Sequence, residues 1–85
     1  MVNEMKIFNI NGVVVSEECK IEFGVNVKRI GSKSWVRYEN YMEAVNVLEF
    51  FEKGGLIEDL RYDCKKGFCK LVERYDIKNK KVVII

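Results

Sequence analysis

The stretch from Asn40 to Lys53, NYMEAVNVLEFFEK, decides the fold, because it alone carries the marks of a complete helix. Asn40 as N-cap and Glu43 three residues later form a variant of the capping box, and Gly54-Gly55 can adopt the left-handed helix end. At about 100° per residue, one arc roughly 160° wide holds mostly apolar side chains. They are Tyr41, Ala44, Val45, Val47, Leu48 and Phe51. We therefore expect one central helix over residues 40–53 that buries this face.

A second stripe runs along the same predicted helix. Met42, Asn46 and Phe50 follow one another at i+4 steps, between the acidic Glu43 and Glu49. The stripe is either further core, buried under the amino-terminal strands, or a docking surface. Phe and Met displayed on an acidic helix would suit a protein partner or a twofold homodimer. These five residues form the predicted partner-binding site.

Strand signals lie on the amino-terminal side of the helix. Met5–Ile10 and Val13–Val15 flank Asn11-Gly12, a dipeptide typical of two-residue hairpin turns. Residues 19–27 alternate apolar and polar, which predicts a strand with one buried face. A turn at residues 31–33 then leads to a short predicted strand over residues 34–38.

The carboxyl-terminal third is open to two interpretations. Phe68, Leu71, Val72 and Tyr75 fit a helical stripe, but a hairpin that sets Cys64 opposite Cys69 brings opposite charges together across the strands. We prefer the hairpin, which pairs Asp63 with Lys70, Asp59 with Arg74 and Tyr62 with Leu71. A turn over residues 76–80 and a last strand over residues 81–85 would complete a three-stranded meander.

These elements predict an α+β fold in which an antiparallel sheet, made of the amino-terminal hairpin and strands and the carboxyl-terminal meander, packs on a single central helix. The length of 85 residues predicts one small globular domain over residues 1–85.

Composition limits the classes of protein to consider. The longest apolar run, Val82 to Ile85, is far too short for a membrane span or a secretory signal, so we expect a cytoplasmic protein. A net charge of +2 does not by itself indicate nucleic-acid binding. The chain has no His, Pro, Gln or Thr and is rich in Lys, Asn, Ile and Glu, as an A+T-rich coding sequence would give. This usage hints at a low-GC or thermophilic host or a mobile element.

Catalytic motifs are missing from the sequence. Without His, Ser-His-Asp and Cys-His mechanisms cannot operate, and the glycine spacing matches neither a dinucleotide fingerprint nor a P-loop. Glu58, Asp59 and Asp63 form an acidic cluster, which we interpret as solvated ion pairs. We expect no cofactor and no enzyme activity, with a His-independent nuclease as a minor alternative.

The three cysteines, Cys19, Cys64 and Cys69, are too few for a zinc site without His. We interpret them as small buried thiols, with a Cys64–Cys69 disulfide as the alternative in an oxidising setting.

The basic stretch 28–38 supports a second functional hypothesis. It carries four cations and two aromatic rings with no acid, a composition that suits phosphate binding and base stacking. A nucleic-acid site there would use Lys28, Arg29, Lys33, Trp35 and Arg37. The competing interpretation is a solvated turn whose aromatic residues anchor the next strand. We expect a small protein-binding regulator or inhibitor, and a nucleic-acid-binding module is the alternative.

Overall fold

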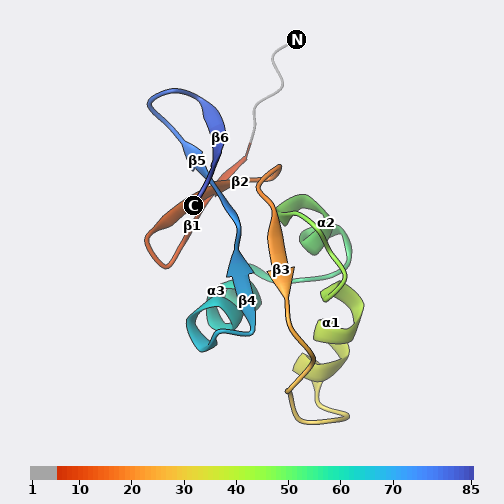
Figure 1. Cartoon of the computed structure of the whole chain (residues 1–85). Helices are drawn as coiled ribbons and strands as arrows, with labels where there is room; N and C mark the ends of the chain where they lie inside the picture. The colour runs from red at the N-terminus through yellow and green to blue at the C-terminus, as the bar shows by residue number, and fades with distance from the viewer. Residues whose placement is uncertain (1–5) are drawn as a thin grey trace.

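The computed structural model describes residues 6–85 as three helices and three two-stranded antiparallel sheets (Figure 1). The predicted α+β class is therefore confirmed. In chain order the elements are β1 (Ile7–Ile10), β2 (Val13–Ser16), β3 (Ile21–Phe23), α1 (Lys33–Tyr41), α2 (Val47–Glu52), α3 (Ile57–Lys66), β4 (Cys69–Leu71), β5 (Glu73–Asp76) and β6 (Lys81–Ile84).

The amino-terminal hairpin is present as predicted. β1 pairs with β2, and the turn residues Asn11 and Gly12 both have positive φ, 53° and 96°. The Asn9 carboxamide oxygen accepts a hydrogen bond of 2.8 Å from the Gly12 amide and supports the turn. Met5, predicted as the first residue of this hairpin, lies outside the described residues.

The prediction of one helix over residues 40–53 is wrong. α1 ends at Tyr41 and α2 begins at Val47, because the segment between them lies alongside the chain around β3. The Val45 carbonyl accepts a hydrogen bond from the Ile21 amide, and the Val47 amide donates to the Cys19 carbonyl, both at 3.1 Å. These long-range bonds hold the intervening backbone in an extended form and override its helical propensity.

The helices also begin at other residues than predicted. Asn46, and not Asn40, caps α2, since its side-chain oxygen accepts a hydrogen bond of 2.8 Å from the Glu49 amide. Residues 34–38, predicted as a strand, belong to α1, whose N-cap Ser32 accepts from the Trp35 amide. The basic stretch is therefore half loop and half helix.

The predicted hairpin over residues 59–74 is wrong as well. Residues 57–66 form α3, which carries acids in its first turn and lysines in its last. The helix ends at Gly67 in the left-handed conformation (φ 82°). β4 then pairs with β3, aligning Leu71 with Ile21 and Cys69 with Phe23. No three-stranded meander forms among residues 6–85, and β3–β4 becomes the central pair.

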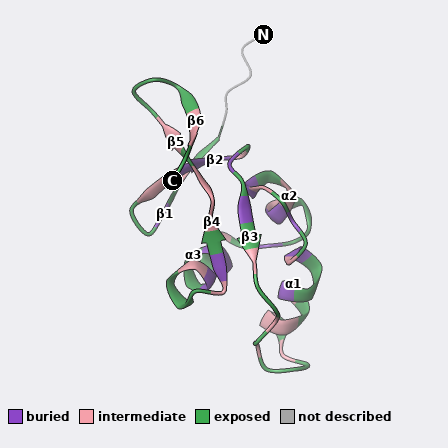
Figure 2. Ribbon diagram, viewed as in Figure 1, coloured by how far each residue is buried: buried purple, intermediate pink, exposed green. Residues whose placement is uncertain are grey.

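The carboxyl-terminal hairpin β5–β6 is present at the predicted turn, and β5 packs against β2. Figures 1 and 2 show the β3–β4 pair between α3 on one side and α1 and α2 on the other, with buried residues facing this centre. The core consists of Ile10, Val15, Cys19, Ile21, Tyr38, Tyr41, Ala44, Val47, Phe50, Leu60 and Cys69. Among residues 6–85, no helix is both long enough and apolar enough to cross a bilayer.

Candidate functional site

The structure places the predicted docking stripe mainly inside the protein. Phe50 is fully buried, and its ring centroid lies 4.5 Å from that of Tyr41. Asn46 is engaged as the cap of α2, and Met42 is half-buried against the core. Phe50 and Met42 therefore belong to the core side of this interpretation: Phe50 lies in the core and Met42 packs against it. The acidic members differ, because Glu43 is exposed and Glu49 is half-buried in the first turn of α2.

The structure separates the cations of the basic stretch into two groups. Lys28 and Arg37 point inward, where each forms an ion pair with a carboxylate of α3. Arg29 and Lys33 are exposed, and Trp35 is half-buried in α1. The five residues proposed for nucleic acid thus do not form one cationic surface.

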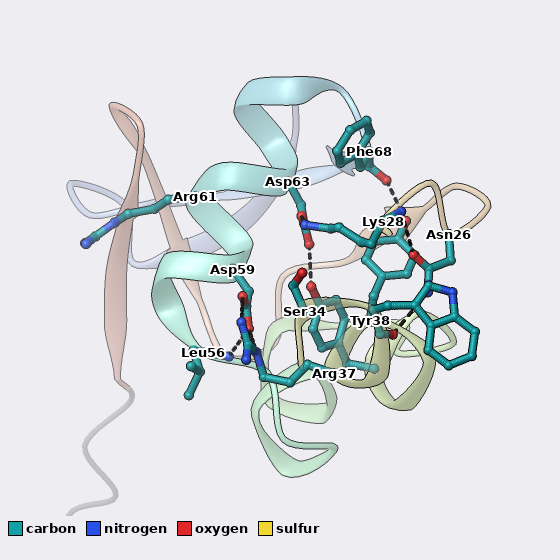
Figure 3. A network of polar contacts seen from close by, with 12 residues as sticks. Asn26, Lys28, Ser34, Arg37, Tyr38, Leu56, Asp59, Arg61, Asp63 and Phe68 are labelled. Carbon is teal, nitrogen blue, oxygen red and sulfur yellow. Dashed lines mark hydrogen bonds and ion pairs between the residues drawn. The ribbon is translucent and has the colours of Figure 1, made fainter. Parts of the chain in front are cut away.

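Asp63 lies at the centre of a buried polar cluster between α3 and α1 (Figure 3). The Lys28 ammonium is 2.5 Å from Asp63 Oδ1, and the Tyr41 hydroxyl donates to Oδ2 at 2.5 Å. Burial, together with the hydrogen bond to Asp63, raises the pKa of Tyr41. The Tyr41 phenol is therefore a hydrogen-bond donor to the carboxylate.

Aromatic rings enclose the Lys28 ammonium on its other sides. Its Nζ lies 4.6 Å from the ring centroid of Tyr62, 5.5 Å from that of Phe68 and 5.8 Å from that of Tyr38. Cation–π attraction adds to the Asp63 ion pair in offsetting the desolvation of the charge.

A second ion pair links the same two helices. Arg37 donates from Nε and Nη2 to the two oxygens of Asp59, at 2.8 and 2.9 Å. The Asp59 side chain also accepts a hydrogen bond of 3.2 Å from the Leu56 amide, at the start of α3. The hydrogen bond to Asp59 raises the pKa of Arg37. Asp59 and Asp63, one helical turn apart, thus fasten α3 to α1 and to the preceding loop. The predicted pairing with Arg74 and Lys70 is wrong.

These inward contacts fix the loop that joins β3 to α1, residues 24–32. The Tyr38 hydroxyl donates to the Gly24 carbonyl at 2.7 Å. Asn26 Nδ2 donates to the Trp35 carbonyl and to Glu39 Oε1, each at 3.1 Å, while Asn26 Oδ1 accepts from the Lys28 amide. Each of these residues anchors the loop backbone against α1.

The alternation of residues 19–27 reverses after Phe23, where the strand ends. The polar Asn26 and Lys28 point inward, whereas Val25 and Val27 are 77% and 57% exposed. Ile30 in the same loop is 83% exposed. We call Val25, Val27 and Ile30 the loop aliphatics. The strand predicted over residues 19–27 is thus shorter, and its last apolar residues face solvent.

A cavity of about 600 Å³ opens beside Val27. Its walls are Val27, Lys28, Arg29, Ser34, Glu58, Asp59, Tyr62 and Phe68. Val25 and Val27 were not predicted as part of a site, because the alternation of residues 19–27 indicated burial. The i, i+4 spacing of Asp59 and Asp63 indicated that both lie on one face of a helix. In the sequence, these residues were instead assigned to cross-strand charge pairs.

Neither models of protein families nor curated proteins nor solved structures gave a match to this chain.

Proposed function

We propose that this protein acts by binding another protein, and that the loop of residues 24–32 docks on the partner through the loop aliphatics. The observation that supports it is the reversed pattern of the loop, in which polar side chains face inward and apolar side chains face outward. Two polar side chains of the loop point inward, while three aliphatic side chains are mostly exposed, where they contribute little to the stability of the fold. Burial in a complex would contribute up to about 1.5–3 kcal/mol for each, before the costs of association are subtracted.

The anchoring of the loop favours this role. Binding loops that are ordered in advance lose less conformational entropy on association. Here the Tyr38 hydroxyl, the Asn26 carboxamide and the buried Lys28 ammonium each hold the loop from within. Figure 1 shows the loop at the end of the molecule opposite the β5–β6 hairpin, so a partner can approach it without meeting that hairpin.

The partner is expected to offer an apolar surface with an acidic border. The loop aliphatics require apolar contact, and the exposed Arg29 and Lys33 flank Ile30 on the two sides in sequence. Charges at the rim of an interface mainly accelerate association and select the partner. A small protein with these properties would serve as a regulator or inhibitor by covering a surface of its partner.

Binding accounts for the polar cluster better than catalysis does. Within residues 6–85, no buried side-chain nitrogen or oxygen lacks a hydrogen-bond partner. Asp59, Asp63, Lys28 and Arg37 are all engaged with one another or with the backbone. A general acid or base needs a free position facing a substrate. We therefore propose a structural role for these carboxylates, which hold the loop and α1 on α3.

Nucleic acid is the alternative ligand for the same region. Arg29, Lys33 and Trp35 could still contact phosphates and bases, but the ion pairs of Lys28 and Arg37 remove half of the cations on which that hypothesis depended. We therefore treat it as an outcome of the test.

The test compares the wild-type chain with Val25→Asp and Ile30→Asp as bait for partners from the host. Ile84→Asp is the matched control, because Ile84 is 78% exposed in β6, outside the 24–32 loop. All three variants should keep the native circular dichroism spectrum, since each residue is exposed. We expect the wild type and Ile84→Asp to capture the same partner and both loop variants to lose it. With the purified partner, calorimetry should show affinity reduced by about tenfold or more for each loop variant.

Three results would contradict the proposal. One is a partner whose affinity is unchanged in both loop variants. Another is saturable quenching of Trp35 fluorescence by oligonucleotides, which would assign the loop to nucleic acid. The logarithm of the binding constant would then fall with the logarithm of the salt concentration, with a slope of roughly −0.7 to −0.9 per phosphate contacted. The third is self-association in sedimentation velocity that Ile30→Asp abolishes, which would make a second copy the occupant.

A further inference from the structure

Two free thiols lie together at the junction of α3 and β4. Cys64 is in the last turn of α3, and Cys69 is the first residue of β4. The left-handed Gly67 reverses the chain between them, and the Phe68 amide donates to the Asp63 carbonyl at 2.8 Å. The predicted hairpin is wrong, but the fold still brings Cys64 and Cys69 to the wall of one cavity.

Both sulfur-bearing residues line a cavity of about 640 Å³. Its apolar wall comes from Ile10, Val13, Leu71 and Ile85, and Lys65 and Lys70 lie at its border. Cys64 is half-buried and Cys69 is nearly fully buried, so Cys64 is the more accessible of the two.

The two thiols influence each other's ionisation. Hydrogen bonding from Cys69 to the Cys64 thiolate lowers the pKa of Cys64, although burial and the negative charge of Asp63 act in the opposite direction. The same hydrogen bond, together with burial, raises the pKa of Cys69. The first proton therefore leaves the pair more readily than the second, and the thiolate resides on Cys64.

We propose that the cavity is a reaction site for small anionic disulfides, with Cys64 as the attacking thiolate and Cys69 as the resolving thiol. The Cys64 sulfur attacks one sulfur of the incoming disulfide, so that a mixed disulfide forms and one small thiolate leaves and takes up a proton. Cys69 then loses its proton and attacks the Cys64 sulfur, which releases the second small thiol. The protein dithiol is oxidised to a Cys64–Cys69 disulfide, and the small disulfide is reduced to two thiols.

The two lysines determine the class of ligand. Lys65 and Lys70 are exposed cations beside a largely apolar cavity, so they attract a ligand that carries carboxylates. Glutathione disulfide has this charge, and cystamine is a cationic disulfide of smaller size. Faster reaction with glutathione disulfide at low salt is therefore expected.

Cys19 provides the internal control. It is fully buried, and its sulfur accepts a hydrogen bond of 3.3 Å from the Ser16 amide. Cys19→Ser should leave the reaction with disulfides unchanged.

The experiment follows the native, reduced protein by intact mass spectrometry during incubation with glutathione disulfide. We expect the wild type to lose two hydrogens after a transient adduct, Cys69→Ser to stop at the adduct, and Cys64→Ser to show neither. A serine hydroxyl can still donate to Cys64, whereas alanine cannot. Adduct formation should therefore be roughly three- to tenfold slower in Cys69→Ala than in Cys69→Ser.

Peptide mapping of the wild type after brief iodoacetamide treatment gives a second test that needs no variant. Modification of Cys64 well before Cys69 and Cys19 supports the proposal. Reaction only after addition of denaturant, or adduct formation in Cys64→Ser at the wild-type rate, would overturn it. Faster reaction with cystamine than with glutathione disulfide at low salt would overturn the ligand class.

Discussion

The ammonium group of Lys28 lies 2.5 Å from the Asp63 carboxylate, with side-chain exposures of only 9% and 0%. This contact joins the middle of the 24–32 loop to α3, 35 residues later in the chain. A buried ion pair is a weak source of net stability, because desolvation offsets most of the attraction. Its consequence here is positional: with the lysine directed inward, the valines on either side of Asn26 are directed outward.

Replacing Lys28 with Met should destabilise the protein strongly. The variant leaves Asp63 buried with the Tyr41 hydroxyl as its remaining side-chain donor, and an unpaired buried charge costs about 3–5 kcal/mol. Urea unfolding monitored by circular dichroism gives the free energy of unfolding. The control is Lys28→Met combined with Asp63→Asn, in which no buried charge remains and the amide oxygen still accepts from Tyr41. A single variant within about 1 kcal/mol of wild type would show that the pair is solvated.

Alkaline pH should weaken the fold through Tyr38. Burial raises the pKa of Tyr38 from 10.0 to about 12, so the folded protein retains this proton at pH values where the unfolded chain has lost it. The contribution of Tyr38 to the free energy of unfolding is constant below pH 10 and falls as the pH rises from 10 to about 12, by up to about 3 kcal/mol. The raised pKa of Tyr41 acts in the same direction.

Urea unfolding at about pH 8, 10 and 12 measures this loss. The Tyr38→Phe variant lacks the ionising group, so its stability should decline less over the same interval. Equal declines in the two proteins would contradict the assignment to Tyr38.

Local turn chemistry could be predicted from the sequence, whereas the helix limits could not. The Asn11-Gly12 hairpin and the β5–β6 hairpin depend on neighbouring residues, and both are present. The helix prediction used Asn40 and Glu43, but the same N-x-x-E pattern recurs at Asn46 and Glu49. Only the hydrogen bonds of residues 45–47 to the chain around β3 decide between the two patterns. Contacts so distant in the sequence leave no local signal.

The candidate site was missed for a related physical reason. Acids in the first turn, lysines in the last turn and Gly67 after it were complete signals for α3, but cross-strand charge pairing explained the same residues. Once Asp63 is placed on a helix, it faces Lys28 and not Lys70. The exposure of Val25 follows from that pairing, because a lysine held inside reverses the pattern that indicated a buried strand.

Two asparagine variants test which N-x-x-E pattern begins a helix. Asn46→Ala should reduce the free energy of unfolding by about 1 kcal/mol, because the Glu49 amide loses its acceptor at the start of α2. Asn40→Ala should change it by less than about 0.5 kcal/mol, since Asn40 is an exposed residue within α1. Urea unfolding of the two variants side by side checks both values. A larger loss of unfolding free energy for Asn40→Ala than for Asn46→Ala would contradict the two-helix arrangement and favour a single helix that begins at Asn40.

Gly55→Ala should destabilise the protein by about 1–3 kcal/mol through overpacking. A Cβ atom on Gly55 would overlap the buried Phe50 ring, coming within 2.6 Å of its Cε2 atom, and the fully buried ring has little room to move. The matched control is Gly24→Ala, whose Cβ atom would meet only the Phe68 carbonyl oxygen at an ordinary 3.8 Å. Thermal and urea unfolding should therefore show a lower free energy of unfolding for Gly55→Ala and a nearly unchanged one for Gly24→Ala. Combining Gly55→Ala with Phe50→Leu should cost less than the sum of the two single substitutions, because the shorter side chain makes room for the methyl group. Strict additivity would mean that the two residues do not touch.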